Sequence, residues 1–444
     1  MSEQAAPRVS EQAAPAAEHT SGEQVLHALA TSPGGPQLLG VCQQRDDVAL
    51  VGGAVRDLLL ARTPRELDVV VGGDAGALAR ELADLLGANV TAHERFGTAL
   101  VQWEQGRIDI ARRRAESYPA PGALPDVRPG SIAEDLARRD FTVNAIAVVL
   151  GGAQRAALHS AEHASEDLAA GRLRVLHERS FLDDPTRLWR LARYHARLGF
   201  QPEPHTAELA AQAVANGAPA TVSRARSGAE LRLALAEAHA PAALQAIDAL
   251  GLLAALHPRL RFDRQLAHSA LALLRVAHPT GGRSPRADLL MLAVLLAPAL
   301  AGGAAKDELY TLLDELEFPA GDRDAALHEA ASAPDAAARL ASATTPSEIH
   351  QAAAPMSGEG VALAGAWGAL RTGSERAEAA ARAWLTELSN VALLITGDDL
   401  LAAGIPEGPE IRRRLDAALL RKLDGQLAGD GPGAELSAAL EASP

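Results

Sequence analysis

The sequence is poor in cysteine and in aromatic residues. Its one cysteine, Cys42, excludes an intramolecular disulfide and a zinc site built from cysteines. A chain of this kind suits a reducing compartment, so we expect a cytoplasmic protein. Aromatic residues make up only 3% of the 444 residues, whereas alanine and leucine are abundant, and this composition favours helix over sheet.

Long apolar runs and an N-terminal export signal are also lacking. A membrane helix needs about 18 consecutive apolar residues, and the nearest candidate, Leu289–Leu300, is shorter and contains proline. The first residues do not combine a basic start with an apolar run, as a secretory signal would. We expect no membrane span and no membrane partner.

Positive charge is scarce overall. The formal net charge of −14 argues against a broadly basic nucleic-acid-binding surface. A protein that grips one short end of an RNA needs only a local positive strip, and arginines do gather in places. These clusters are Arg112–Arg114, Arg138-Arg139, Arg187/Arg190/Arg193 and Arg412–Arg414.

Two glycines, Gly52-Gly53, are followed closely by Arg56. Because glycine has no Cβ, such a turn lets backbone amides approach a phosphate, and a planar guanidinium suits phosphate oxygens. We predict that these residues hold the triphosphate of a nucleotide. The alternative is an ordinary turn that starts a short helix.

Two carboxylates, Glu66 and Asp68, lead into a run of three valines. Side chains at i and i+2 share one face of a strand, so both carboxylates would point to the same side. Two carboxylates beside a phosphate-binding turn are what a pair of Mg²⁺ ions needs for in-line nucleotidyl transfer. The alternative is a buried strand with a charged edge.

Apolar patterns predict two kinds of structure along the chain. In the first part of the chain, short apolar runs predict strands, two of which would form a hairpin. An amphipathic helix is expected between the earlier strands and the hairpin, over Asp74–Leu86. From about Ser165 onward the pattern is almost entirely helical, with prolines as breaks. The expected strands are Asp47–Val51, Leu67–Val71, Ala99–Trp103 and Arg107–Ala111.

An ordered set of motifs occupies residues 48–200. After the Gly-Gly turn and the acidic pair come Arg95-Phe-Gly-Thr, Pro121-Gly-Ala-Leu-Pro, Arg138-Arg-Asp-Phe-Thr-Val-Asn and Asp183-Asp-Pro-Thr-Arg. The set resembles the class II tRNA nucleotidyltransferase and bacterial poly(A) polymerase family. This resemblance implies template-independent addition of CCA, or of its terminal A, to the tRNA 3′ end. ATP would be the substrate, with CTP left open, and Mg²⁺ the cofactor of a two-metal reaction.

The resemblance also implies an α/β nucleotidyltransferase head with a small mixed sheet, followed by an all-α neck, body and tail. Residues 1–22 are low in bulky apolar residues, so we predict a disordered tail there. The head would span residues 23–165. The neck, which would recognise the base and bind RNA, would span 166–260, and a body and tail that bind tRNA would span 261–444.

Further site residues follow from the resemblance. Asp109 is a candidate third acidic ligand, although it could equally pair with Arg107 or Arg112 at a strand edge. Four more lie in one motif. Arg138 and Arg139 are implied to lie near the phosphates of the nucleotide, and Asp140 and Asn144 near its ribose. From the residues alone, Asp140 would also cap an apolar helical run that follows it.

The series Asp184, Arg187, Arg190 and Arg193 has a spacing of three residues, which places all four on one side of a helix. Burying so many arginines is costly without anions to meet them. By resemblance, Asp184 and Arg187 would read the edge of the base. Arg190 and Arg193 would bind phosphate or support the two residues that read the base. The alternative is a surface ladder of ion pairs.

Three departures from the family pattern leave other functions open. Glu66 replaces the usual Asp, Ser160 to Ala164 replace Asp-Pro-x-Gly-Gly, and Ala225 replaces the Glu of a Ser-x-Glu-Arg motif. These changes favour a catalytically lapsed RNA-binding homologue. A poly(A) polymerase is a second alternative, but the acidic C-terminal stretch argues against it. The motif forms look most like the A-adding branch, while CC-adding and full CCA addition stay open.

Overall fold

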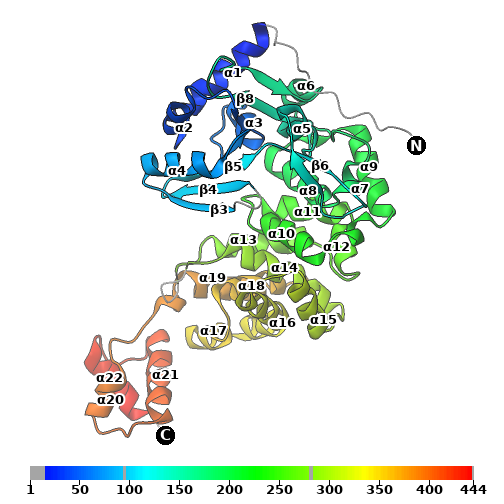
Figure 1. Ribbon diagram of the computed structural model, residues 1–444. Helices are drawn as coiled ribbons and strands as arrows, with labels where there is room; N and C mark the ends of the chain where they lie inside the picture. The colour runs from blue at the N-terminus through cyan, green and yellow to red at the C-terminus, as the bar shows by residue number, and fades with distance from the viewer. Residues whose placement is uncertain (1–15, 94–96, 280–283, 443–444) are drawn as a thin grey trace. The chain divides into compact units, whose positions relative to one another are not determined.

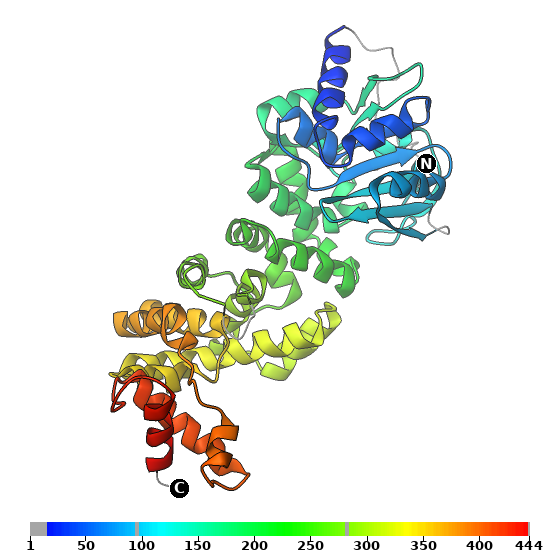
Figure 2. The same ribbon diagram turned by 90° about the vertical axis from the view of Figure 1, so that its left-hand side faces the viewer.

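The structure is a computed structural model that describes residues 16–93, 97–279 and 284–442 (Figure 1, Figure 2). It divides into two compact units, Met1–Ser223 and Arg224–Pro444. The division falls inside the predicted neck, 166–260. Helix α1 (Ala16–Leu29) begins within the predicted tail 1–22, whose first fifteen residues lie outside the described residues, as does Arg95.

A seven-stranded mixed sheet forms the centre of the first unit, with the order β3-β4-β5-β2-β1-β8-β9. Strand β2 pairs parallel with β5, and the other pairs are antiparallel. The small mixed sheet predicted from the sequence is therefore confirmed. Its strands are β1 (Val48–Val51), β2 (Leu67–Val71), β3 (Asn89–His93), β4 (Thr98–Trp103), β5 (Gly106–Arg112), β8 (Ile146–Val149) and β9 (Leu158–Ser160).

The central strands β1 and β8 are buried along their whole length, as their continuous apolar sequences require. Helices α1, α2 (Gly35–Cys42), α3 (Gly53–Leu59) and α4 (Ala75–Leu86) contribute to the larger core on the sheet. Asp74 caps α4 by accepting from the amide of Gly76 at 2.8 Å. Cys42 lies in this core, where burial raises the pKa of its thiol to about 12.

One local expectation is wrong. The segment after Asp140 is a short 3₁₀ turn, η2 (Thr142–Asn144), followed by strand β8, and not a helix that Asp140 caps. β-branched residues dominate Ile146–Val149, and the strand pairs with β1 at the middle of the sheet. Tertiary pairing therefore decides the structure of this apolar run.

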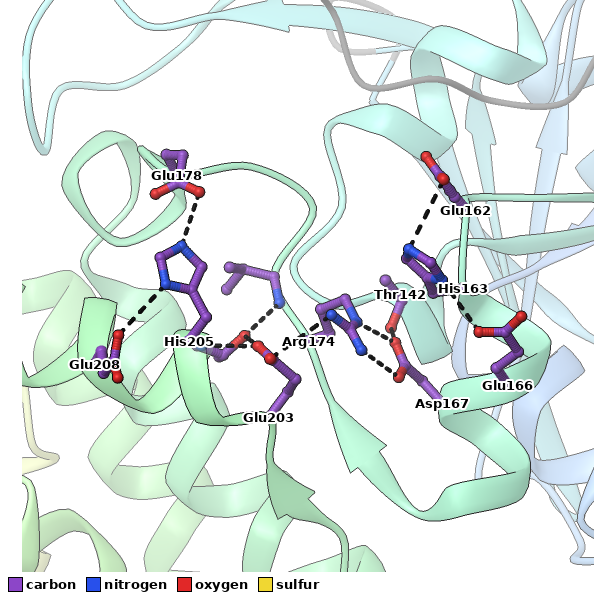
Figure 3. A network of polar contacts seen from close by, with 12 residues as sticks. Thr142, Glu162, His163, Glu166, Asp167, Arg174, Glu178, Glu203, His205 and Glu208 are labelled. Carbon is purple, nitrogen blue, oxygen red and sulfur yellow. Dashed lines mark hydrogen bonds and ion pairs between the residues drawn. The ribbon is translucent and has the colours of Figure 1, made fainter.

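The rest of the first unit is mainly helical, and a buried polar network ties it to the sheet. Figure 3 shows Asp167 facing both Arg174 and Thr142. Asp167 accepts from Nε of Arg174 and from Oγ1 of Thr142, each at 2.8 Å. This network fixes the turn η2 to α6. The elements of this region are α5 (Ile132–Ala137), α6 (Ala164–Ala170), α7 (Ser180–Asp183), α8 (Thr186–Leu198), α9 (Pro204–Ala215), η3 (Ala218–Thr221) and the short strands β6 (Arg114–Ser117), β7 (Asp126–Pro129), β10 (Arg172–Leu173) and β11 (Gln201–Pro202).

The described part of the second unit is helical, which confirms the all-α prediction for this half. Prolines lie in the first turns of several helices, where the missing N–H has no cost. Its helices are α10 (Arg224–Leu235), α11 (Ala240–Ala249), α12 (Leu252–Leu256), α13 (Arg264–Leu274), α14 (Ala287–Ala301), α15 (Lys306–Glu315), α16 (Ala320–Ser342), α17 (Pro346–Ala353), α18 (Gly358–Thr372), α19 (Glu375–Thr386), η4 (Leu388–Asn390), α20 (Gly397–Ala402), α21 (Pro409–Leu423) and α22 (Pro432–Glu441).

The last three helices, α20 to α22, share a small apolar core of their own. Within it, the buried carboxylate of Glu435 accepts from the amide of Leu394 and from Nζ of Lys422, each at 2.6 Å. Among the residues that the structure describes, no helix is long and apolar enough to cross a membrane.

Replacing Asp167 with alanine should lower the free energy of unfolding by about 3 kcal/mol, because the change leaves the Arg174 guanidinium and the Thr142 hydroxyl without their buried acceptor. Chemical denaturation of the full chain measures this loss. Glu166→Ala on the same helix, at a highly exposed side chain, is the control and should change stability by less than about 0.5 kcal/mol. Equal losses in the two variants would contradict the assignment.

Candidate active site

Three carboxylates from β2, the residue before it and β5 lie close together. Glu66 directly precedes β2, Asp68 lies on β2, and Asp109 lies on the parallel neighbour β5 in register with Asp68. One oxygen from each carboxylate lies within 4.8 Å of the others. Oxygen donors in such a group suit a hard divalent cation, so the predicted acidic trio fits a metal site.

The electrostatics of Asp68 favour the arrival of a cation. Burial raises the pKa of Asp68 to about 6, and the charge of Asp109 adds to this, while Arg139, Arg190 and Arg56 oppose it. A carboxylate whose pKa is raised in this way gains from any positive charge that comes to it.

Arg107 contacts two members of the trio. It is two residues before Asp109 on β5 and forms ion pairs with Glu66 and with Asp109, the second at 3.2 Å between Nε and Oδ2. All three side chains are partly exposed. The sequence left open whether Asp109 binds metal or pairs with Arg107. The structure contains the pairing and also the grouping that a metal needs.

The glycine turn lies at the start of α3, beside the acidic trio. Gly52 has a φ of +70°, and a Cβ there would lie 2.6 Å from Nη1 of Arg139, so a side chain would displace that arginine. The Gly52 amide donates to the carbonyl of Ile146 at 2.9 Å, so it is not available to bind a ligand. The amides offered to a ligand by this turn therefore begin at Gly53.

Arg56 points into the protein and is only 1% exposed. Its Nε donates to Asp57 at 2.8 Å and its Nη1 to Oδ1 of Asn144 at 2.5 Å, and the guanidinium lies 5.6 Å from the ring centre of Tyr194. The residue lines the site, but its main contacts are with the protein. It connects α3 to the turn η2.

Asp140 is the centre of a buried hydrogen-bond network. Its carboxylate accepts from the backbone amide of Phe141 (2.8 Å), from Nδ2 of Asn144 (2.9 Å) and from Nε of Arg190 (2.7 Å). Burial alone would raise the pKa of Asp140, but the charge of Arg190 and the hydrogen bonds outweigh it and hold the pKa at about 2. Asp140 therefore stays ionised and holds Arg190 in place.

Arg138 and Arg139 share a carboxylate that the sequence interpretation missed. Asp135 is fully buried, and its two oxygens accept from Arg138 at 2.8 Å and from Arg139 at 3.0 Å. Arg138 also donates to Glu116 at 3.1 Å. Asp135 lies on α5 and the two arginines follow the end of that helix, and the spacings of three and four residues between them are the signal that could have found this contact.

The arginine series lies on α8 as predicted. Arg187 is 3% exposed and donates to Oγ of Ser180 at 2.7 Å and to the carbonyl of Arg138 at 2.6 Å, and Arg193 is 7% exposed. Two of the arginines are therefore buried, and the alternative of a surface ion-pair ladder is wrong. Asp184 was expected on the same helix as the arginines, and that part of the prediction is wrong: it lies before α8 with an extended backbone and accepts from the amide and the hydroxyl of Thr186.

A pocket of about 180 Å³ opens beside the acidic trio. It is lined by the start of α3, by the loop that precedes β2 and by the end of α8. Glu66, Asp68 and Arg56 are in its wall, and so are three further arginines that the motifs did not single out. These are Arg62, Arg65 and Arg197.

Residues 48–174 match the family model of the poly A polymerase head domain. The chain is 33% identical over 394 residues to the A-adding tRNA nucleotidyltransferase of Geobacter sulfurreducens, covering 86% of this chain and 44% of that protein. It is 45% identical over 192 residues to the A-adding enzyme of Halalkalibacterium halodurans (43% of this chain, 45% of that protein). A CC-adding enzyme of Deinococcus radiodurans is 41% identical over 211 residues (46% and 54%). The chain thus spans about half the length of these relatives.

Solved structures agree along nearly the whole chain. An apo form of a CCA-adding enzyme is 26% identical with a TM-score of 0.72, covering 97% of this chain and 96% of that one. The Thermotoga maritima CCA-adding enzyme complexed with tRNA is 25% identical with a TM-score of 0.71, covering 94% and 99%.

Arg107→Gln should strengthen Mn²⁺ binding roughly threefold, because it removes a cation that contacts two of the three carboxylates, and a partly exposed pair contributes under about 1 kcal/mol. Titration of free Mn²⁺ by electron paramagnetic resonance, without nucleotide, measures this affinity. The matched control is Arg112→Gln at the end of the same strand, which should leave it unchanged. Unchanged or weaker binding in Arg107→Gln would show that the carboxylates do not form the ion site.

Proposed function

The chain belongs to the tRNA nucleotidyltransferase and poly(A) polymerase family, and we propose that it adds nucleotides to the 3′ end of tRNA from ATP, with CTP as a second substrate to be tested. The observation that carries the proposal is the acidic trio beside a glycine turn and an arginine-lined pocket. Relatives that add A, CC or CCA to tRNA support it. Such an enzyme would work in the cytoplasm.

In this proposal, Glu66, Asp68 and Asp109 hold Mg²⁺, which when bound activates the RNA 3′-hydroxyl and offsets charge on the leaving pyrophosphate. Gly53 at the start of α3 offers its amide to the phosphates. Arg139 lies against Gly52 and faces the same region. Gly53 and Arg139 would bind and orient the triphosphate. The positive charge of Arg139 would offset the repulsion between the triphosphate and the carboxylates.

The base and the ribose are assigned to α8 and η2. Asp184 and Arg187 are proposed to read the edge of the base, and the bonds of Arg187 to Ser180 and to the Arg138 carbonyl fix the direction of its guanidinium. Asp140 and Asn144 are proposed to orient the ribose of the nucleotide. Arg190 and Arg193 are proposed to support these base- and ribose-binding residues, because Arg190 is held by Asp140.

The decisive test is extension of three tRNA transcripts, ending before the CCA, after C and after CC, with Mg²⁺ and ATP or CTP supplied separately and together. Adenosine added only to the CC end would identify an A-adding enzyme, and growth of every transcript would identify full CCA synthesis. Long A tails on unrelated RNA would favour a poly(A) polymerase. No extension, with RNA still bound, would contradict the proposal and favour a lapsed homologue.

Asp68→Asn should lower the rate of nucleotide addition at least a hundredfold while preserving the fold, because the amide keeps the shape of the carboxylate but loses the charge that a metal needs. Single-turnover extension of the tRNA that the wild type uses measures the rate, and circular dichroism checks the fold. Glu104→Gln, at an exposed position in the β4–β5 turn, serves as the control. Retained activity in Asp68→Asn would remove the metal assignment.

A further inference from the structure

Tyr194 on α8 has three arginines around its ring. The guanidinium carbons of Arg56, Arg190 and Arg197 lie over the ring, at 5.6, 5.5 and 5.0 Å from its centre. Each distance is within the limit of about 6 Å inside which the negative face of an aromatic ring attracts a cation. Arg190 also donates from Nη2 to the Tyr194 hydroxyl at 2.9 Å. The sequence motifs did not single out this tyrosine.

The spacing along α8 explains two of the three contacts. Arg190, Tyr194 and Arg197 are four and three residues apart, so they share one face of the helix. Arg56 comes from α3 and is 1% exposed, so it reaches the ring within the core. Phe141, which directly precedes the turn η2, packs edge-on against the same ring, with the ring centres 5.8 Å apart. The ring therefore joins α3, α8 and the start of η2.

Two of the three arginines hold the residues that we assign to the ribose. Arg56 donates to Oδ1 of Asn144, and Arg190 donates to the carboxylate of Asp140. Bringing three guanidiniums together costs electrostatic repulsion, which Asp57 and Asp140 offset in part through ion pairs of 2.7 and 2.6 Å. The tyrosine ring adds an attraction that acts at its faces, so it restricts the direction of each guanidinium as well as stabilising the charge.

A plainer interpretation is that Tyr194 only fills the core, where it is 9% exposed and contacts Phe141. The two interpretations differ in what the ring must supply. A side chain that fills space needs volume and shape, whereas a side chain that directs arginines needs negative charge on its ring faces. Arg56 and Arg197 also line the pocket beside the acidic trio, so the ring contacts residues of the site itself.

We propose that Tyr194 is a positioning residue for ribose recognition. Its ring directs the guanidiniums of Arg56 and Arg190. Through them it fixes the side chains of Asn144 and Asp140, and the inference rests on the proposed function, which assigns these two side chains to the ribose. A ring with less negative faces should therefore weaken the preference for ribose over deoxyribose.

The test is the ratio of the affinities for ATP and dATP, measured by isothermal calorimetry on the full chain with Mg²⁺ and without tRNA. One variant is Tyr194→Phe, which keeps the ring and loses the hydroxyl. A second has a trifluorinated phenylalanine at position 194, introduced by amber suppression, which keeps the shape of the ring but removes most of the negative charge from its faces. The matched control has the same fluorinated residue in place of Phe200, a buried ring beside Gly171.

Tyr194→Phe should prefer ATP as the wild type does, to within about twofold, because the ring faces remain and Asp140 keeps its ion pair with Arg190. The fluorinated residue at position 194 should lower the preference for ATP roughly fivefold, because the attraction for the guanidiniums is lost while the core stays filled. The fluorinated control at position 200 should retain the wild-type preference. Circular dichroism checks that each variant is folded.

The inference is overturned if the fluorinated residue at position 194 leaves the preference for ATP unchanged. It is also overturned if Tyr194→Phe shows the same loss, which would assign the role to the hydroxyl, or if the control at position 200 shows it, which would indicate a general loosening of the core. A wild type that binds ATP and dATP equally would contradict it as well. The proposed function fails separately, if binding follows the expected pattern and yet the wild type extends no tRNA transcript.

Discussion

The arrangement of the site depends on one buried anion, the carboxylate of Asp140. It is ionised, with a pKa of about 2, and it is met by Arg190 from α8 and by the amide of Asn144. Asn144 in turn accepts from Arg56 on α3. Each of these groups would be costly to bury without the next, so the chain of contacts forms as a whole. It joins the glycine turn, the turn η2 and the arginine helix, which come from three separate parts of the sequence.

Two aspartates of the site have opposite electrostatic environments, and the contrast separates structure from chemistry. Burial and a neighbouring carboxylate raise the pKa of Asp68 to about 6, whereas arginine and amide donors hold that of Asp140 at about 2. Asp140 already has its cation within the protein. Asp68 gains one only when a positively charged ligand comes, so it is the group prepared for a metal.

The elements that the sequence predicts well are those set by local pattern. The run from Leu67 to Val71 is the strand expected there, because an apolar segment interrupted only by Asp68 suits a buried strand with one polar side chain. The apolar run after Asp140 was expected to be a helix, and periodicity over so few residues cannot distinguish the two structures. The sequence pattern could not predict long-range contacts. Asp109 meets Asp68 only because β2 and β5 pair in parallel, and Arg56 meets Asn144 across 88 residues. The family resemblance supplied the candidate residues, but the inward direction of Arg56 and the shared acceptor Asp135 emerge only from the packed structure.

The most direct test of the account is a crystal structure of the full chain with Mn²⁺ and a non-hydrolysable ATP analogue, with the ions located by their anomalous scattering. The account predicts manganese against the carboxylates of Glu66, Asp68 and Asp109, with the triphosphate between the start of α3 and the arginines of the pocket and the base toward α8. Manganese away from these carboxylates, or a nucleotide bound elsewhere on the chain, would contradict it.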